Sequence, residues 1–457
     1  MNSAEHGYSV VGFVDDDPSK RGVIVSGKAV LGTVEELPRI VERFRVAMVL
    51  IAISRIPAAR IREILEMCTE LKLRFKILPV SFAYLNDRVT ATMLQDLTPE
   101  DLLPRRQVDL ADSGVRVRVV RRRAMVTGSA GSIGREICVQ LVKAGVAQLV
   151  MVDLNENEMY LHSRHLQRLY PELSLLTEVG DVRDPGRMEA LFAKYRPQDV
   201  FHAAAHKHVP LMEIAPAEAI KNNVLGTRNV ARAADRSGAE RFVFVSTDKA
   251  VRPTSVMGAS KRVAEMIVRQ MARTSRTRFC AVRFGNVLGS SGSVVPLFRA
   301  QIAAGGPVTV TDPEVKRYFM TVREAVGLVL RAGYGDHGEL CVLDMGEQIR
   351  ILDLARHMIT MVGNVPGVDV KIELTGLRPG EKLYEELLTE AEERTEPVDL
   401  RIFVARCPAP PEDLEARVDE LAEAAAAEDE ARVRSLLREL VPSYEPAEPA
   451  AEGAATA

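Results

Sequence analysis

Short apolar runs alternate with amphipathic helical patterns along most of the chain. Continuous apolar runs, typical of buried strands, occupy residues 10–14, 46–53, 74–78, 124–127, 148–152, 173–179 and 241–245. Apolar residues recur at helical spacing in 57–71, 137–142 and 262–272. Because strands and helices alternate, the chain is expected to form an α/β fold with parallel sheets.

Breaks in this pattern predict the domain organisation. Residues 1–82 form a small α/β domain, 83–122 a linker, 123–400 the main domain, and 401–457 a tail. In the linker, Thr98 and Pro99 are expected to start a single helical turn, and residues 115–120 alternate between apolar and basic. The basic triplet 121–123 could contact phosphate but is more typical of a solvated strand flank. The tail predicts helices over 413–427 and 429–440, followed by disorder over 442–457.

A glycine-rich turn follows the first strand of the main domain. Gly128, Gly131 and Gly134 let the backbone turn tightly and approach a pyrophosphate at a helix N-terminus. The triplet alone could be an ordinary turn, but the next strand ends in Asp153, at about the distance of a ribose-binding acid. The pattern therefore predicts a dinucleotide site. Asp153 favours NAD, because a carboxylate repels the 2′-phosphate of NADP, although basic neighbours could make NADP possible.

A second polar stretch follows the strand 241–245. Thr247, Asp248 and Lys249 come directly after the strand, and the helix that follows brings Met257 and Lys261 beside them. Ligands bind at this end of the strands in open α/β sheets. Crowded charged groups have perturbed pKa values, which proton transfer requires. The alternative interpretation of Asp248 and Lys249 is a surface ion pair at a strand end.

In combination, these motifs resemble the extended short-chain dehydrogenases. Within that superfamily, residues 202–213, 246–249, 317–321 and 378–382 resemble the long-chain nucleotide-sugar 4,6-dehydratases of bacterial polysaccharide synthesis, the CapD type. The similarity covers about residues 7–401. It implies a Rossmann-type doubly wound parallel sheet, preceded by a small Rossmann-like domain that is truncated. Long-chain members usually begin with membrane helices and a glycine-rich first βα unit, and this chain begins without either, so a structural or regulatory role is expected for residues 1–82.

The resemblance also assigns the site residues. The implied NAD-binding residues are Thr127, Gly128, Gly131, Ser132, Ile133, Gly134, Asp153, Asp181, Val182, Ala203, Ala204 and Lys261. The implied substrate-binding residues are Lys207, Asn223, Arg283, Asn286, Arg317 and Arg378. Asp181 could instead be a turn residue, and residues 378–382 a plain turn. His202, His206 and His208 lie at mixed spacings with no acid among them, so no metal site is expected.

The implied catalytic residues are Thr247, Asp248, Lys249, Met257 and Lys261. Most short-chain dehydrogenases have tyrosine where this chain has Met257, and a thioether cannot take a proton. The long-chain dehydratases commonly carry methionine there. The resemblance implies that NAD takes hydride from C4 of a UDP-linked N-acetylhexosamine, most simply UDP-N-acetylglucosamine. Lys249 would remove the proton from C5, Asp248 would protonate the leaving 6-hydroxyl, Thr247 would bind the 4-hydroxyl, and hydride would return to C6. Lys249 must then be partly neutral, and burial with nearby Lys261 is expected to lower its pKa.

Composition and charge restrict the alternatives. A net charge of −3 gives no indication of a nucleic-acid partner, and five well-separated cysteines without a C-x-x-C pair favour reduced thiols. Without a signal sequence or an apolar run of about 18 residues, a cytoplasmic protein with no membrane span is expected. Two other functions remain open: a nucleotide-sugar 4-epimerase, which normally needs the missing tyrosine, and a non-catalytic sensor or scaffold. The resemblance also implies a possible homo-oligomer.

Overall fold

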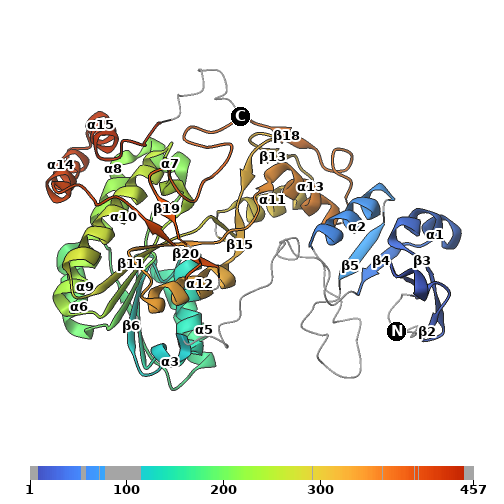
Figure 1. Ribbon diagram of the computed structural model, residues 1–457, viewed down its shortest axis with the longest axis horizontal. Helices are drawn as coiled ribbons and strands as arrows, with labels where there is room; N and C mark the ends of the chain where they lie inside the picture. Colours follow the sequence, from blue (N-terminus) through green and yellow to red (C-terminus); the bar gives the residue numbers. More distant parts are fainter. Residues whose placement is uncertain are drawn as a thin grey trace. The chain divides into compact units, whose positions relative to one another are not determined.

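The computed structural model describes residues 9–52, 58–71, 73–77, 115–290, 292–362, 364–395, 397–399 and 401–446 (Figure 1). Contacts within the chain group it into two compact units. The first comprises Met1–Arg106, Val294–Pro313 and Ile351–Thr375, and the second Gln107–Ser293, Glu314–Arg350 and Gly376–Ala457. The domains expected from the sequence have other bounds and stay predictions. The helical turn expected at Thr98 and Pro99 lies outside the described residues.

The second unit is built on a nine-stranded sheet of order β19-β20-β16-β11-β10-β9-β6-β7-β8. From β16 to β8 all neighbouring strands are parallel, whereas β20 and β19 add an antiparallel edge. The strands are β6 Arg123–Thr127, β7 Gln148–Asp153, β8 Ser174–Val179, β9 Asp199–His202, β10 Arg241–Val245, β11 Arg278–Arg283, β16 Leu340–Leu343, β19 Glu393–Arg394 and β20 Ile402–Arg406.

Both faces of this sheet are covered by helices. Alternate residues of the central strands, such as Val126 and Met125, belong to separate apolar clusters on the two faces. One cluster includes helices α3 Val115–Val119, α4 Ser132–Lys143, α5 Glu156–Leu169 and α12 Val322–Gly335, and the other α6 Pro185–Tyr195, α9 Gly226–Ser237 and α10 Val256–Thr274 (Figure 1). The predicted Rossmann-type doubly wound parallel sheet is therefore confirmed.

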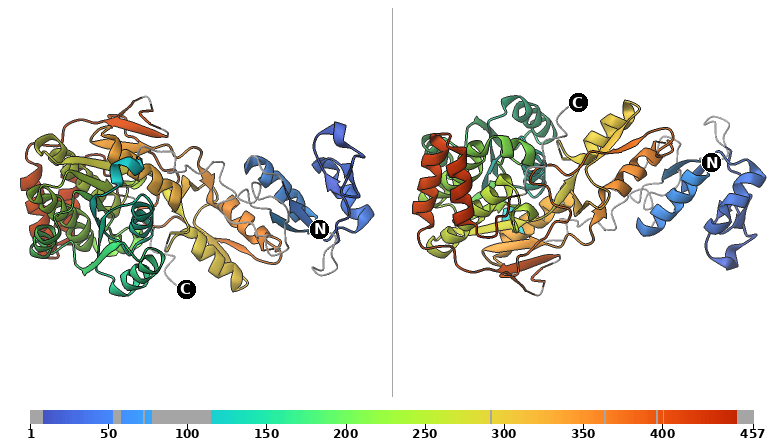
Figure 2. Two further views of the ribbon diagram at one scale, coloured as in Figure 1. Left: turned by 90° about the horizontal axis from the view of Figure 1, so that it is seen from below. Right: turned by 90° about the horizontal axis from the view of Figure 1, so that it is seen from above.

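Helices of the C-terminal tail cover α10. The helices α14 Leu414–Ala426 and α15 Glu430–Leu440, red in Figure 2, contact α8 Pro216–Ala219 and α10 and share an apolar cluster with them. Tyr444 is buried in this cluster, and the Glu445 N–H donates to the Pro253 carbonyl. The expected disorder is thus wrong for residues 442–446, whereas residues 447–457 lie outside the described part.

The segment around Arg122 is held by a buried acid. Residues Val115–Val119 form the short helix α3, because Val115 and Val119, one turn apart, are both buried against the sheet. The Arg122 guanidinium makes two hydrogen bonds to the fully buried Asp199, at 2.5 and 2.7 Å, and the Tyr334 hydroxyl donates to the same carboxylate. Arg122 therefore stabilises the start of β9 and is not placed to bind phosphate.

Short elements complete the second unit. The strand β12 Asn286–Leu288 pairs in parallel with β15 Phe319–Thr321, and β14 Lys316–Arg317 pairs antiparallel with β17 Ile349–Arg350. The remaining helical segments are α7 Val209–Ile214, the π-helical turn η8 Ile220–Leu225 and the 3₁₀ turn η9 Asp248–Ala250.

The first unit contains three small sheets. They are the three-stranded sheet β1-β3-β2 and the parallel pairs β4-β5 and β13-β18. The hairpin of β2 and β3 and the helix α1 were not predicted from the sequence. The elements are β1 Phe13–Val14, η2 Pro18–Lys20, β2 Ile24–Val25, β3 Lys28–Gly32, η3 Val34–Glu36, α1 Leu37–Phe44, β4 Met48–Ile51, α2 Ala58–Glu70, β5 Arg74–Ile77, α11 Val294–Ala303, β13 Val308–Val310, α13 Ile351–Met361 and β18 Ile372–Leu374. Among the helices of the described residues, none combines the length and apolar character that crossing a membrane requires.

Candidate active site

The glycine-rich turn between β6 and α4 is packed too tightly for side chains. Gly128 has φ +72°, and a Cβ there would lie 2.4 Å from the backbone nitrogen of Ala204. A Cβ on Gly134 would lie 2.0 Å from the Gly128 carbonyl oxygen. The turn therefore closes against Ala203 and Ala204 at the end of β9, and α4 begins at Ser132 and Ile133 with Gly131 as its N-cap.

Hydrogen bonds fix Thr127 and Asp153 beside this turn. The Thr127 hydroxyl lies 2.7 Å from Nδ1 of His202, whose Nε2 lies 3.0 Å from the Thr227 hydroxyl. Burial lowers the pKa of His202 to about 3, so this imidazole is neutral. The Asp153 carboxylate accepts the Ala130 N–H at 2.8 Å and the Asn155 N–H at 2.9 Å, which holds the acid against the glycine-rich turn.

Asp181 and Val182 follow β8 at the same edge of the sheet. The Asp181 carboxylate accepts hydrogen bonds from the backbone and guanidinium of Arg183. Burial raises the pKa of Asp181, but these hydrogen bonds outweigh it and leave that pKa below its ordinary value. Val182 is buried against Gly226, where a Cβ would lie 2.7 Å from it.

The close approach at Gly134 predicts a large effect for one added methyl group. Gly134→Ala is expected to destabilise the protein by about 1–3 kcal/mol, because its Cβ would meet backbone atoms that cannot move aside. Gly131→Ala is the matched control, since its Cβ comes no closer than 3.4 Å to the nearest protein atom. Thermal unfolding without cofactor measures both. An unchanged melting temperature for Gly134→Ala would contradict the packing described here.

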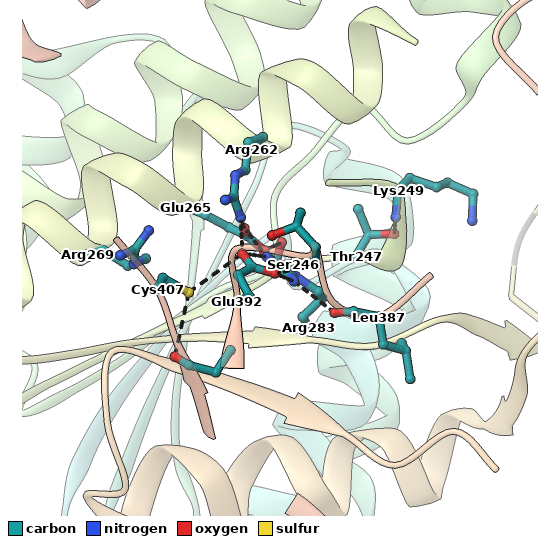
Figure 3. Close-up of polar contacts among 12 residues, drawn as sticks. Ser246, Thr247, Lys249, Arg262, Glu265, Arg269, Arg283, Leu387, Glu392 and Cys407 are labelled. Atoms are coloured by element: carbon teal, nitrogen blue, oxygen red, sulfur yellow. Dashed lines mark hydrogen bonds and ion pairs between the residues drawn. The ribbon is translucent and has the colours of Figure 1, made fainter. Parts of the chain in front are cut away.

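The polar stretch after β10 is hydrogen-bonded around the buried Asp248. Lys249 Nζ lies 3.0 Å from Asp248 Oδ1, 2.9 Å from Asn286 Oδ1 and 3.3 Å from Glu385 Oε1. Thr247, the N-cap of η9, donates its hydroxyl to Asp248 Oδ1 at 3.0 Å and accepts the Lys249 N–H, a contact drawn in Figure 3. The Asp248 side chain is fully buried, so Asp248 and Lys249 are not the surface ion pair considered as the alternative.

The direction of the Lys249 pKa differs from the prediction. Burial lowers the pKa of Lys249, but the charges of Asp248 and Glu385 outweigh burial and raise it above its ordinary value. The expected lowering is therefore wrong. Burial raises the pKa of Asp248, against the charge of Lys249 and the hydrogen bonds from Lys249 and Thr247, which lower it.

Lys261 is the lysine whose pKa is lowered most clearly. Burial lowers the pKa of Lys261 to about 7, against the opposing charge of Glu265. Its Nζ donates to the Val245 carbonyl at 2.7 Å and lies 3.9 Å from the centre of the Phe244 ring. Met257, one turn earlier on α10, is buried in the apolar cluster that includes α14 and α15. The position of Met257 beside Lys261 is as predicted, and its side chain serves packing.

The substrate contacts expected for Lys207, Asn286 and Arg378 stay predictions. Burial and the charge of Lys249 lower the pKa of Lys207, and its Nζ lies 3.5 Å from the Ser290 hydroxyl. Asn286 accepts the hydrogen bond from Lys249 described above. Arg378 is exposed, and its backbone N–H donates to Glu381.

Asn223 is not free to bind substrate. Its Oδ1 accepts the His206 N–H at 2.8 Å, and its Nδ2 donates to the His206 carbonyl and to the Ser260 hydroxyl, both at 3.0 Å. The amide is 1% exposed. The expected substrate contact is therefore wrong for Asn223, because its amide anchors the loop that carries Lys207.

Arg283 is likewise committed to the protein interior. Its guanidinium binds the carboxylates of Glu265 and Glu392 and the Leu387 carbonyl, and all three charged side chains are fully buried (Figure 3). These contacts occupy every donor of the guanidinium, which argues against the substrate contact expected for Arg283. Arg317 is also buried, donating to Glu381 at 3.0 Å and to the carbonyls of Lys316 and Leu383.

The acids that organise this region were not predicted from the sequence. Figure 3 shows Glu265 from α10 and Glu392 between Arg262 and Arg283, and the Ser246 hydroxyl donates to Glu265 at 2.6 Å. Glu265 lies one turn from Lys261, Arg262 and Arg269 on α10, so its place among charged residues gave no signal of its burial. Glu385 lies beyond the 378–382 stretch and carried no signal of its own.

Comparisons with known proteins agree with this arrangement. The family model described as polysaccharide biosynthesis protein matches residues 124–406, and the one described as CoA-binding domain matches residues 1–79. A probable polysaccharide biosynthesis protein EpsC from Bacillus subtilis (strain 168) is 44% identical over 398 residues, which cover 87% of this chain and 66% of EpsC. The chain thus spans just under two thirds of that relative.

Two further proteins are similar over the main sheet. A UDP-glucose 4-epimerase of Rickettsia rickettsii (strain Sheila Smith) is 35% identical over 295 residues, which cover 62% of this chain and 82% of the epimerase. An X-ray structure of Pen from Bacillus thuringiensis is 33% identical with a TM-score of 0.59, covering 64% of this chain and 91% of Pen.

Proposed function

Because this chain belongs to the polysaccharide biosynthesis protein family, we propose that it removes water from a nucleotide sugar. The proposed reaction is the NAD-dependent 4,6-dehydration of a UDP-linked N-acetylhexosamine, most simply UDP-N-acetylglucosamine. The observation that carries the proposal is the hydrogen-bonded triad of Thr247, Asp248 and Lys249 at the carboxyl end of β10, with Asp248 buried and Met257 in place of a proton-transferring side chain.

The residues at the glycine-rich turn fit a dinucleotide. A backbone turn that excludes Cβ atoms at Gly128 and Gly134 leads into the N-terminus of α4, where backbone N–H groups favour a pyrophosphate. Asp153 lies beside this turn and favours NAD over NADP. When bound, NAD supplies the acceptor and donor of hydride. In the proposed reaction, Lys261 would hold the nicotinamide end of the cofactor.

The proton transfers fall on three adjacent side chains. Oxidation at C4 releases the 4-hydroxyl proton, which Thr247 passes to Asp248 across their 3.0 Å hydrogen bond. Asp248 then donates this proton to the 6-hydroxyl, which leaves as water. Lys249 takes the proton from C5 and returns it to C5 when hydride reaches C6. Since carboxylates stabilise its ammonium form, Lys249 must first release a proton, so turnover is expected to rise with pH.

A 4-epimerase is the second candidate, because a 35% identical relative bears that name. Mass spectrometry separates the two after incubation of the purified chain with UDP-N-acetylglucosamine and NAD. Loss of one water from the sugar is the expected result. An epimerised sugar of unchanged mass would replace the dehydratase with the epimerase. Bound nucleotide sugar without turnover would instead favour a sensor or scaffold.

A further inference from the structure

Glu385 is a buried acid that reaches the proposed active site. Its side chain is 3% exposed, and Oε1 lies 3.3 Å from Lys249 Nζ and 3.6 Å from Arg317 Nε. Its second oxygen, Oε2, is buried with no hydrogen-bond partner among the described residues, and the same holds for Asp248 Oδ2. Buried carboxylate oxygens normally have hydrogen-bond partners. Two carboxylates that each have one unpartnered oxygen, both next to Lys249, therefore indicate acceptors that a ligand or water would bind.

Glu385 is one of the two carboxylates that face Lys249, while Glu381 pairs with Arg317 from another side. Asp248 and Glu385 provide two negative charges, and Lys249 and Arg317 two positive charges. Lys207 acts on Lys249 and Lys382 acts on Glu385 through their charges, while Asn286 contributes a neutral oxygen. Without Glu385, Lys249 would keep only Asp248 as an ion-pair partner, and Arg317 would keep Glu381.

We propose that Glu385 is a positioning residue, whose carboxylate holds the Lys249 amine beside Asp248 and sets the charge of that amine before substrate enters. The proposal rests on the proposed function, in which Lys249 must exchange a proton. The competing explanation is that Glu385 only stabilises the packing of its own chain segment against β14, through its ion pair with Arg317. In that case its removal would lower stability without changing the protonation of Lys249.

Competitive labelling of amines tests the proposal directly. The full chain is treated with acetic anhydride over a pH series, and peptide mass spectrometry gives the labelling midpoint of Lys249, with the exposed Lys194 as internal standard. In Glu385→Gln, the midpoint is expected to move toward acid by about one pH unit or more, because a charge within about 4 Å that favours the ammonium is gone.

Two further variants make the result specific. Glu386→Gln is the matched control, because Glu386 pairs with Arg252 and Lys382 and should leave the Lys249 midpoint in place. Glu385→Asp keeps the negative charge but moves it farther from Lys249, so a smaller shift of the midpoint in the same direction is expected. This variant replaces Glu385→Gln in the test if Glu385→Gln does not fold. An unchanged midpoint in a folded Glu385 variant would overturn the proposal.

The labelling needs no substrate, so its outcome is independent of the proposed reaction. If the wild-type chain releases no water from UDP-N-acetylglucosamine, the proposed dehydratase function is wrong. The labelling midpoint of Lys249 still decides whether Glu385 is coupled to Lys249. If turnover is found, the pH at which Glu385→Gln reaches half of its own maximal rate should fall in parallel with the midpoint. If Glu385→Gln lowers the rate but leaves its pH dependence unchanged, Glu385 has a structural role only and the proposal is wrong.

Discussion

Replacement of Lys249 by methionine is expected to slow the loss of water from UDP-N-acetylglucosamine by about 10²–10⁴-fold, the usual contribution of a positioned acid or base. Methionine has nearly the same length but no amine, so the proton on C5 loses its acceptor. Affinity for NAD should stay within about twofold, because Lys249 contacts Asp248, Asn286 and Glu385 and none of the residues around the glycine-rich turn.

Two variants distinguish loss of the base from loss of the charge. Lys249→Arg keeps a cation beside Asp248 and Glu385 but stays protonated, so it should be about as slow as Lys249→Met. Lys194→Met removes an exposed lysine that pairs with Glu178 and should keep the wild-type rate. A Lys249→Met variant that retains more than about a tenth of the wild-type rate would exclude Lys249 as the base.

Local sequence order was enough to predict the parts of the site that lie close together in the chain. The apolar runs that became β6, β7 and β10 are continuous. β6 ends in Thr127 and β7 in Asp153, whereas the polar residues Ser246 and Thr247 directly follow β10. Met257 and Lys261 came together because both lie on one helix, four residues apart. Such relations depend on helix and strand periodicity alone.

Relations between distant segments could not be predicted in this way. Arg283 was expected to bind substrate from the resemblance alone, because its partners, Glu265 and Glu392, come from a helix and from a loop that are distant in the sequence. The raised pKa of Lys249 depends on Glu385, which no motif includes. In both cases the net charge of a buried group is set by tertiary contacts, and a single sequence does not reveal them.

Replacement of Arg283 by methionine is expected to destabilise the protein by about 3–5 kcal/mol, the usual effect of removing one partner from a buried ion pair. Glu265 and Glu392 have fully buried side chains and would lose their main counter-charge, leaving Arg262 to face both. For a unit of this size, each kcal/mol lowers the melting temperature by about 2–4 °C, so thermal unfolding measures the effect readily.

Arg278→Met is the matched control, since Arg278 lies on the same strand but pairs with Asp336 near the surface and should cost no more than about 1 kcal/mol. A substrate-binding arginine would behave in the opposite way: its loss would raise KM and leave the melting temperature unchanged. Every donor of Arg283 is occupied by Glu265, Glu392 and Leu387. The melting temperature and the KM of the Arg283 variant together decide whether this arginine stabilises the protein interior or binds the nucleotide sugar.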